Sequence, residues 1–167
     1  MEYPWPLEDH VLQPALLENG DLKFAEEYKN IRRVSVNNEG NGWKIKDLWT
    51  SSAIKSVFND LIIHNGYAYG FDGLYLVCVD LNDGKRIWRG GRYQGFTILS
   101  ADQDIILLLS EKGDVALVSA SPDKFTELSR FQALKGKTWN HPAIGGNILL
   151  VRNSLEMAAF RLPLSEK

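Results

Sequence analysis

The chain has 167 residues, of which 44% are hydrophobic and 24% charged, a composition typical of a folded globular domain and not of a disordered chain. Nineteen Lys and Arg residues against 21 Asp and Glu residues leave a net charge of −2, so nucleic-acid binding through overall charge is not expected. The single cysteine, Cys78, excludes an internal disulfide and a multi-cysteine zinc site, and no apolar run approaches the ~18 residues of a membrane span.

From residue 30 onward the chain alternates short apolar runs, rich in β-branched and aromatic residues, with Gly, Asn and Asp turn signals. Residues 11–30 are ambiguous between a short helix and strand with loop. The expected strands lie near 31–36, 43–49, 60–64, 67–71, 75–80, 85–89, 96–101, 104–110, 114–119, 125–131, 139–144, 147–152 and 156–161. Pairs such as Asn65-Gly66 and Asp83-Gly84 between them are typical of hairpin turns. This succession predicts an all-β fold of antiparallel meanders and not a βαβ order.

The strands recur with a period of about 40 residues. Gly73 and Gly113 are 40 residues apart, and Trp49 precedes Trp88 by 39. This period, with four strands per unit, is typical of β-propeller blades, whereas a β-sandwich would require the spacing to be accidental. We therefore predict a β-propeller of four-stranded antiparallel blades, in an open partial ring of about 3–4 blades. The expected blades lie at 12–50, where the repeat is degenerate, and near 59–89, 96–131 and 139–162, within a single domain over 1–167.

One repeat carries a specific motif between residues 78 and 88. It resembles the tryptophan-docking repeat of pyrroloquinoline quinone (PQQ) type β-propellers, with matches at Asp80, Gly84, Lys85 and Trp88. In such a turn the Asp accepts hydrogen bonds, and the Gly supplies a left-handed backbone and a bare peptide face. The indole can then lie on a neighbouring blade and bury a large apolar area. We expect Trp88 to be buried against the neighbouring blade, near Gly84, in a structural and not a catalytic role.

The resemblance extends over residues 43–162, which are similar to the C-terminal half of bacterial PQQ-like repeat proteins. Such proteins are often labelled as outer-membrane assembly lipoproteins or alcohol dehydrogenases. Within the motif, Cys78 and Asp83 stand where the pattern has Ala and Thr. The resemblance implies strand and loop for residues 11–30, a larger propeller of which this chain is a part, and a periplasmic or secreted location. The first ten residues carry no secretion signal, so the chain by itself does not fix the location.

The likeness to PQQ proteins raises the question of catalysis. PQQ dehydrogenases need a Ca²⁺ site, a carboxylate base and usually two adjacent cysteines, whereas this chain has one cysteine, inside an expected strand, and no clear calcium cluster. Its carboxylates stand at turns and strand ends, where they ordinarily accept backbone hydrogen bonds. No His-x-His or His-x₃-His spacing supports a metal site. We assign no catalytic residue, metal or cofactor; PQQ and calcium belong to the alternative of a dehydrogenase fragment.

Residues on the connecting loops are the candidates for ligand binding, because polar and aromatic groups there commonly face a channel or a partner. The candidates are Arg92, Tyr93, Gln94, Trp139, Asn140, His141 and Arg152. Structural alternatives stay open: either arginine could pair with a carboxylate of an adjacent blade, and His141 could be hydrogen-bonded between blades. His64, before the Asn65-Gly66 turn, is expected at a rim of the fold.

These residues favour a non-catalytic PQQ-like repeat scaffold that binds a protein or a small ligand through its loops and channel. The alternative is a fragment of a PQQ-dependent alcohol or sugar dehydrogenase, so whether the chain is an enzyme stays open. Neither a nucleic-acid partner nor a membrane span is expected. A partial ring leaves blade edges and apolar faces uncovered, so self-association through open blade edges is also expected.

Overall fold

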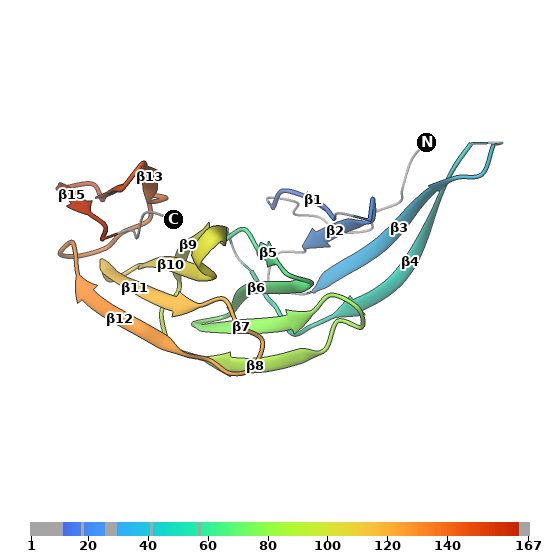
Figure 1. Cartoon of the computed structure of the whole chain (residues 1–167), viewed down its shortest axis with the longest axis horizontal. Coiled ribbons are helices and arrows are strands. Elements are labelled where there is room, and N and C mark those ends of the chain that lie inside the picture. The colour runs from blue at the N-terminus through green and yellow to red at the C-terminus, as the bar shows by residue number, and fades with distance from the viewer. Residues whose placement is uncertain (1–11, 18, 26–29, 41, 57, 164–167) are drawn as a thin grey trace. The chain divides into compact units, whose positions relative to one another are not determined.

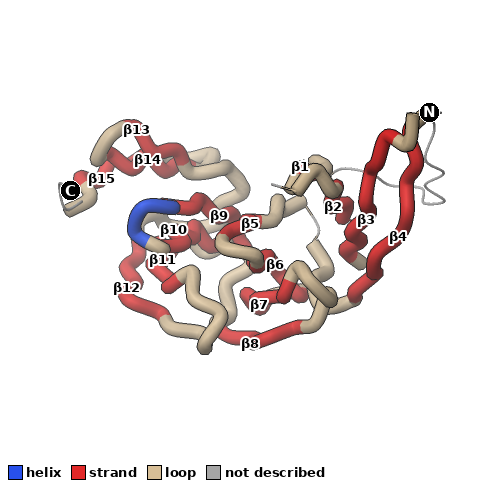
Figure 2. Tube along the Cα trace, turned by 45° about the vertical axis from the view of Figure 1, so that its right-hand side comes forward, coloured by secondary structure: helices blue, strands red, loops and turns tan. Residues whose placement is uncertain are grey.

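The computed structural model describes residues 12–17, 19–25, 30–40, 42–56 and 58–163. In these residues the strands form three four-stranded sheets and one three-stranded sheet, and their order within each sheet follows the chain (Figure 1). The helical content of the described part is one short 3₁₀ turn, Ala101–Gln103, drawn in blue in Figure 2. None of its helical structure has the length or hydropathy of a membrane span. The sheets span residues 15–51, 62–90, 95–132 and 143–161.

The first sheet contains β1 (Ala15–Leu16), β2 (Leu22–Ala25), β3 (Ile31–Asn38) and β4 (Trp43–Ser51). Its first two strands lie in residues 11–30, where the sequence left helix and strand open, and they pair antiparallel. The two long strands β3 and β4 also pair antiparallel, with one register shift along their length.

The second sheet contains β5 (Ile62–His64), β6 (Tyr67–Asp72), β7 (Tyr75–Asp80) and β8 (Arg86–Gly90). The four central residues of β6 and the four of β7 are all buried, so both faces of these strands are covered. Side chains on successive strand residues point to opposite faces, and a continuous apolar run therefore suits a strand covered on both sides.

The third sheet contains β9 (Gly95–Ser100), β10 (Ile105–Ser110), β11 (Asp114–Ser119) and β12 (Glu127–Gln132). Its second strand is buried on both faces, whereas every residue of β12 is exposed. The sheet therefore runs from a covered interior to an outer strand in contact with solvent.

The last sheet contains β13 (Ala143–Gly145), β14 (Ile148–Arg152) and β15 (Met157–Arg161). Along β14 and β15, exposed residues alternate with buried or half-buried ones. One face of this sheet therefore packs on a core, and the other face is exposed.

The chain divides into two compact units, each with its own apolar core. The first unit is Met1–Gly73 with Val77–Arg89, and the second is Leu74–Leu76 with Gly90–Lys167. The first core contains Leu17, Ile31, Ile54, Ala68, Val77, Val79 and Leu81. The second core contains Leu107, Leu109, Val115, Leu134, Leu149 and Val151, and so joins the third and last sheets.

Candidate functional site

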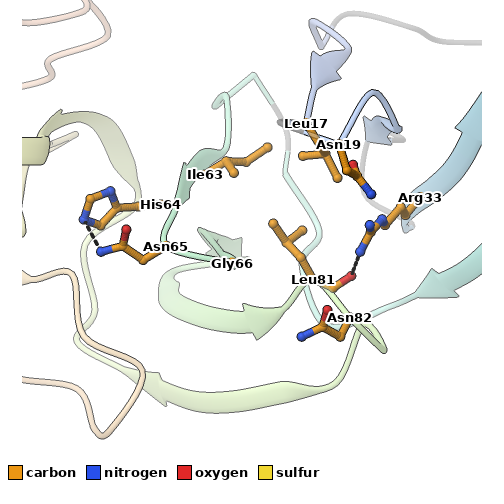
Figure 3. Close-up of a pocket in the computed structure, with 9 residues that line it drawn as sticks. All are labelled: Leu17, Asn19, Arg33, Ile63, His64, Asn65, Gly66, Leu81 and Asn82. Atoms are coloured by element: carbon orange, nitrogen blue, oxygen red, sulfur yellow. Dashed lines mark hydrogen bonds between the residues drawn. The ribbon is translucent and has the colours of Figure 1, made fainter.

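A pocket of about 290 Å³ lies in the first unit, where hairpin turns of the first two sheets come together (Figure 3). The turn between β1 and β2, strand β3, the hairpin between β5 and β6, and the turn after β7 all contribute to it. Its lining residues are Leu17, Asn19, Arg33, Ile63, His64, Asn65, Gly66, Leu81 and Asn82. Because short turns of separate hairpins form this pocket, its position is set by the sheets that carry them.

The floor of the pocket is apolar. Leu17 and Leu81 belong to the first core, and Ile63 packs against it. In Figure 3 these three side chains lie between the polar residues on either side of the pocket. A ligand group that reaches the floor would therefore contact the same apolar surface that stabilises the first unit.

One wall of the pocket holds a partly buried ion pair. The Arg33 Nε and Nη2 atoms donate hydrogen bonds to Asp21 Oδ2 at 2.8 and 2.6 Å, and Asn19 Nδ2 donates to the same oxygen at 2.8 Å. A third guanidinium donor, Nη1, bonds the Leu81 carbonyl oxygen at 2.6 Å. Since the carboxylate compensates the guanidinium, the wall presents hydrogen-bonding groups without a net charge.

The rest of the rim carries uncharged polar side chains. The amide nitrogen of Asn65 lies 3.0 Å from Nε2 of His64, and because an amide nitrogen only donates, the imidazole nitrogen is the acceptor. The Asn82 backbone N–H donates to Asp80 Oδ1 at 2.7 Å, which leaves its exposed amide side chain at the rim. The Leu81 N–H donates to the Gly66 carbonyl at 3.0 Å and ties this turn to the β5–β6 hairpin.

A second, smaller cavity of about 160 Å³ lies in the second unit, near the junction of the third and last sheets. Its walls are mainly apolar, and its lining residues are Ser100, Gln103, Ile105, Leu107, Leu117, Ile144, Leu162 and Pro163. Neither cavity holds a cluster of metal-ligating side chains, and no three His, Cys, Asp or Glu residues gather as such a site anywhere in the described residues.

The predicted candidates Arg92, Tyr93 and Gln94 lie in the loop before β9, outside both cavities. Arg92 is exposed, whereas Tyr93 is only 5% exposed and its hydroxyl donates to Glu127. The Arg130 guanidinium lies 4.6 Å from the centre of the Tyr93 ring and bonds the same carboxylate at 2.5 Å. Burial, with the Glu127 carboxylate, raises the pKa of Tyr93 to about 12. The buried Tyr93 side chain therefore connects the loop before β9 to strand β12.

The other predicted candidates lie on the segment before β13 and on β14. Trp139 is 60% exposed, with Lys137 Nζ 3.6 Å from its ring centre, and the exposed His141 ring lies 4.0 Å from that of Phe96. Arg152 is exposed at the end of β14. Like the loop before β9, this segment contributes no residue to either cavity.

The motif residues form the turn between β7 and β8. The Gly84 N–H donates to the Asp80 carbonyl at 2.9 Å, and the Asp80 N–H donates to the Lys85 carbonyl at 2.9 Å. Trp88 is buried, as expected, and its ring centre lies 5.9 Å from that of Tyr69, on β6 of the same sheet, so its contact with a neighbouring blade stays a prediction. Burial also raises the pKa of Cys78, on β7, to about 12, so its thiol is unreactive near neutral pH.

The indole next to Gly84 is not that of Trp88, which corrects the expected pairing. A Cβ added at Gly84 would lie 2.7 Å from Cε3 of Trp49, and the Trp49 indole N–H donates to the Leu81 carbonyl at 2.9 Å. The φ of Gly84 is +73°, a conformation that favours glycine. The tryptophan of the preceding sheet therefore contacts this turn.

Of the residues that line the pocket, the sequence singled out only His64, as a rim residue, and Asn65-Gly66, as a hairpin turn. It did not single out Asn19, Arg33 or Asn82. A local pattern exists but does not single out the pocket. An Asn lies within two residues before a positive-φ Gly at Gly20, Gly66 and Gly84, and also at Gly40 and Gly42, which do not line it. Nothing local indicated that Arg33 would reach Asp21, 12 residues away, or Leu81, 48 residues away.

No protein-family model and no curated protein sequence matches the chain. Several solved structures do match. BamB from Moraxella catarrhalis, a β-propeller, is 15% identical over 95% of this chain and 46% of its own, with a TM-score of 0.67. A WD40-type chain of the mitotic checkpoint complex is 13% identical over 89% of this chain and 50% of its own, with a TM-score of 0.68. The computationally designed protein Ika4 is 9% identical over 93% of this chain and 99% of its own, with a TM-score of 0.67.

At such low identity these matches establish the fold alone. The chain is all-β with the antiparallel sheets of a β-propeller, so the predicted fold class is confirmed. The chain spans about half the length of the BamB and checkpoint chains. The matches support β-propeller-like repeats and do not reach the narrower PQQ family.

Proposed function

We propose that this chain is a non-catalytic β-propeller repeat scaffold that binds a short peptide segment of a partner protein. The pocket at the hairpin turns of the first two sheets carries this proposal. It combines an apolar floor, an uncharged amide rim and a charge-compensated wall. That combination suits an apolar side chain flanked by main-chain amide groups.

The size of the pocket favours a peptide side chain over a larger ligand. Pockets for drug-sized molecules and cofactors are typically about 300–1,000 Å³, and this one, at about 290 Å³, lies just below that range. One aliphatic side chain with its adjoining peptide groups fits such a space. The rest of a partner chain would extend over the turns outside it.

The polar groups favour an uncharged segment. The amides of Asn19, Asn65 and Asn82 can both donate and accept, as the N–H and C=O groups of a peptide require. The Arg33 guanidinium is already paired with Asp21, so it offers an anionic ligand little net attraction. A charged residue that entered the pocket would lose hydration without gaining a free counter-ion.

We also propose that the scaffold works without metal or cofactor, and outside the cytoplasm. The resemblance of residues 43–162 to exported repeat proteins supports the location. The dehydrogenase alternative makes a distinct prediction: on addition of PQQ and Ca²⁺ the chain would bind the quinone saturably and reduce a redox dye with an alcohol substrate. We expect neither. Fractionation of cells that express the full gene with a C-terminal tag tests the location.

The binding proposal is tested with a minimal probe, N-acetyl-leucine N-methylamide, added to isotope-labelled protein and followed by nuclear magnetic resonance. At about 0.3 kcal/mol for each of its roughly 13 non-hydrogen atoms, the probe should bind with a Kd of about 1 mM. We expect saturable shifts at the amides of Asn65, Gly66 and Asn82. The same compound with glutamate in place of leucine should bind at least about tenfold more weakly.

Matched variants distinguish the pocket from other surfaces. Asn82→Ala removes one rim amide and should weaken binding of the leucine probe about threefold to tenfold, in line with the loss of one hydrogen bond. Asn37→Ala changes an exposed residue on β3 outside the pocket and serves as the control. Shifts confined to the smaller cavity around Ile105 and Leu117, or equal effects of the two substitutions, would contradict the proposal.

A further inference from the structure

The last sheet differs from the other three in the strand that would lie outermost. In the described part of the chain the other sheets each have a fourth strand, β4, β8 or β12, whereas the last sheet ends at β15. Within the described residues, strand β15 pairs with β14 on one side and with no strand on the other. An exposed strand edge offers unpaired N–H and C=O groups to any other strand.

Two backbone hydrogen bonds that flank the β14–β15 ladder identify the groups on that edge. The Leu162 N–H donates to the Asn147 carbonyl at 2.7 Å, and the Asn153 N–H donates to the Glu156 carbonyl at 2.9 Å. In an antiparallel ladder the bonded pairs alternate, so the backbone groups of every second residue between these two pairs point away from β14. On β15 the outward-pointing residues are Met157, Ala159 and Arg161.

The edge of β15 has few of the features that keep exposed edges from pairing. Natural edge strands are protected by charged side chains, proline and bulges. The central residues of β15 are Ala158, Ala159 and Phe160, its register with β14 is unbroken, and its charge is confined to Arg161. The outer strands of the other sheets carry more charge along their length: Lys44, Lys46 and Asp47 on β4, Arg86 and Arg89 on β8, and Glu127 and Arg130 on β12.

We infer that β15 pairs antiparallel with β15 of a second copy of this chain, about a two-fold axis at Ala159. The outward groups lie on the first, third and fifth residues of a five-residue strand, so the edge is complementary to itself. In this register Ala159 faces Ala159, and Met157 faces Arg161 of the second copy. All outward N–H and C=O groups then find partners, and the interface is isologous, as in most homodimers. The inference concerns the second unit and is independent of the pocket in the first.

The side chains beside this edge favour a second copy of the chain as the partner. The exposed face of the sheet bears Leu150, 42% exposed, and Met157, 71% exposed, with Arg152 and Arg161 at its ends. In the two-fold register the Arg161 side chains of the two copies do not lie opposite one another. The aliphatic part of each Arg161 side chain instead contacts Met157 of the other copy. The result is a six-stranded sheet with a continuous apolar centre.

Charge-reversal variants test the axis directly. An edge contact of five residues is smaller than a standard interface, so we expect a dissociation constant of about 10 µM or weaker. Ala159 is exposed, so Ala159→Glu and Ala159→Lys should leave the monomer folded, but each places like charges opposite one another. Light scattering should show each variant alone to dimerise at least about tenfold more weakly, and an equimolar mixture of the two to recover dimers.

A backbone variant provides a second, independent test. Ala159→Pro removes the central outward N–H, which has no partner in the monomer, and should abolish dimerisation; Ala159→Val, the matched control, keeps that N–H and the dimer. Circular dichroism confirms that each variant is folded. A parent chain that stays monomeric up to about 1 mM would overturn the inference. The outer edge of β15 would then be available for pairing with a strand of a different protein. A dimer unaffected by all of these changes would place the interface elsewhere.

Discussion

Strands β10 and β14 have nearly the same apolar sequence and different surroundings. In β10, Ile106–Leu109 are all at most 2% exposed, so both faces are covered. In β14, Leu149 and Val151 are buried, but Leu150, between them, is 42% exposed. A continuous apolar run is typical of a strand covered on both faces. Strand β14 therefore has the sequence of an interior strand, although one of its faces is uncovered.

The largest expected difference between the two strands comes from truncating a leucine in each. Leu108→Ala should lower the free energy of unfolding by about 3 kcal/mol, because it leaves a cavity in a fully buried site. Leu150→Ala should lower it by about 1 kcal/mol or less, because the side chain is already partly hydrated. Denaturant unfolding of both variants measures the difference. Equal losses would show that the face of β14 is covered in solution.

Two glycines, one in the third sheet and one in the last, differ in the same way. A Cβ at Gly95, the first residue of β9, would lie 2.0 Å from the Leu109 carbonyl oxygen, whereas a Cβ at Gly145, the last residue of β13, would meet nothing within 4 Å. Gly95→Ala should therefore cost about 1–3 kcal/mol in unfolding free energy, and Gly145→Ala less than about 0.5 kcal/mol. Thermal unfolding of the Gly95→Ala and Gly145→Ala variants measures this difference in stability. Comparable costs would mean that the last sheet is as tightly packed as the third.

The third sheet should also lose stability at high pH through Tyr93. Its pKa is raised to about 12 from the ordinary 10.0, because burial disfavours the phenolate and the hydroxyl donates to Glu127. The unfolded chain therefore deprotonates first. The contribution of this group is complete below about pH 10 and is lost as pH rises toward 12. Unfolding of Tyr93→Phe should depend less on pH in this window, and a spectrophotometric titration of the parent chain should show a late-titrating tyrosine that is missing from the titration of the variant. A parallel pH dependence in parent and variant would contradict the assignment.

The smallest effect on stability is expected at the exposed face of the last sheet. Met157→Gln should change the unfolding free energy by less than about 0.5 kcal/mol, because the side chain is 71% exposed. It should nevertheless reduce the fluorescence of a dye that binds apolar surface. Leu16→Gln, at a residue 73% exposed in the first sheet, is the control with a matched change. A drop in fluorescence for the control alone would place the dye-binding surface elsewhere.

The local parts of the fold could be predicted from the sequence because the turns are encoded locally. Asn65-Gly66 and Gly113 mark hairpins between neighbouring strands, and every sheet is built from such neighbours. The contact of Trp49 with Gly84 could not be predicted in this way. The 39-residue spacing identified Trp49 as the equivalent of Trp88, but spacing does not say which sheet's indole reaches which turn.

The sites were harder to predict than the fold. Tyr93 has the residue type and loop position of a ligand-binding group. Its hydroxyl instead donates a hydrogen bond to Glu127, which lies 34 residues away on β12. The pocket depends on Arg33, whose partners lie on other hairpins. Loop position predicts exposure on average, whereas the partner of a polar side chain is decided by tertiary packing.

The carbonyl of Leu81 accepts two hydrogen bonds from the first sheet, one from Arg33 and one from Trp49, across 48 and 32 residues. In the described residues the strand pairings of the sheets are all between consecutive strands, so each hairpin can close early and fast. These two bonds, in contrast, can form only after the first two sheets have each taken shape. We therefore expect the attachment of the first sheet to be a late step in folding and an early one in unfolding. In native-state hydrogen exchange, β2 and β3 would then open together, as one cooperative unit, before β6 and β7 do.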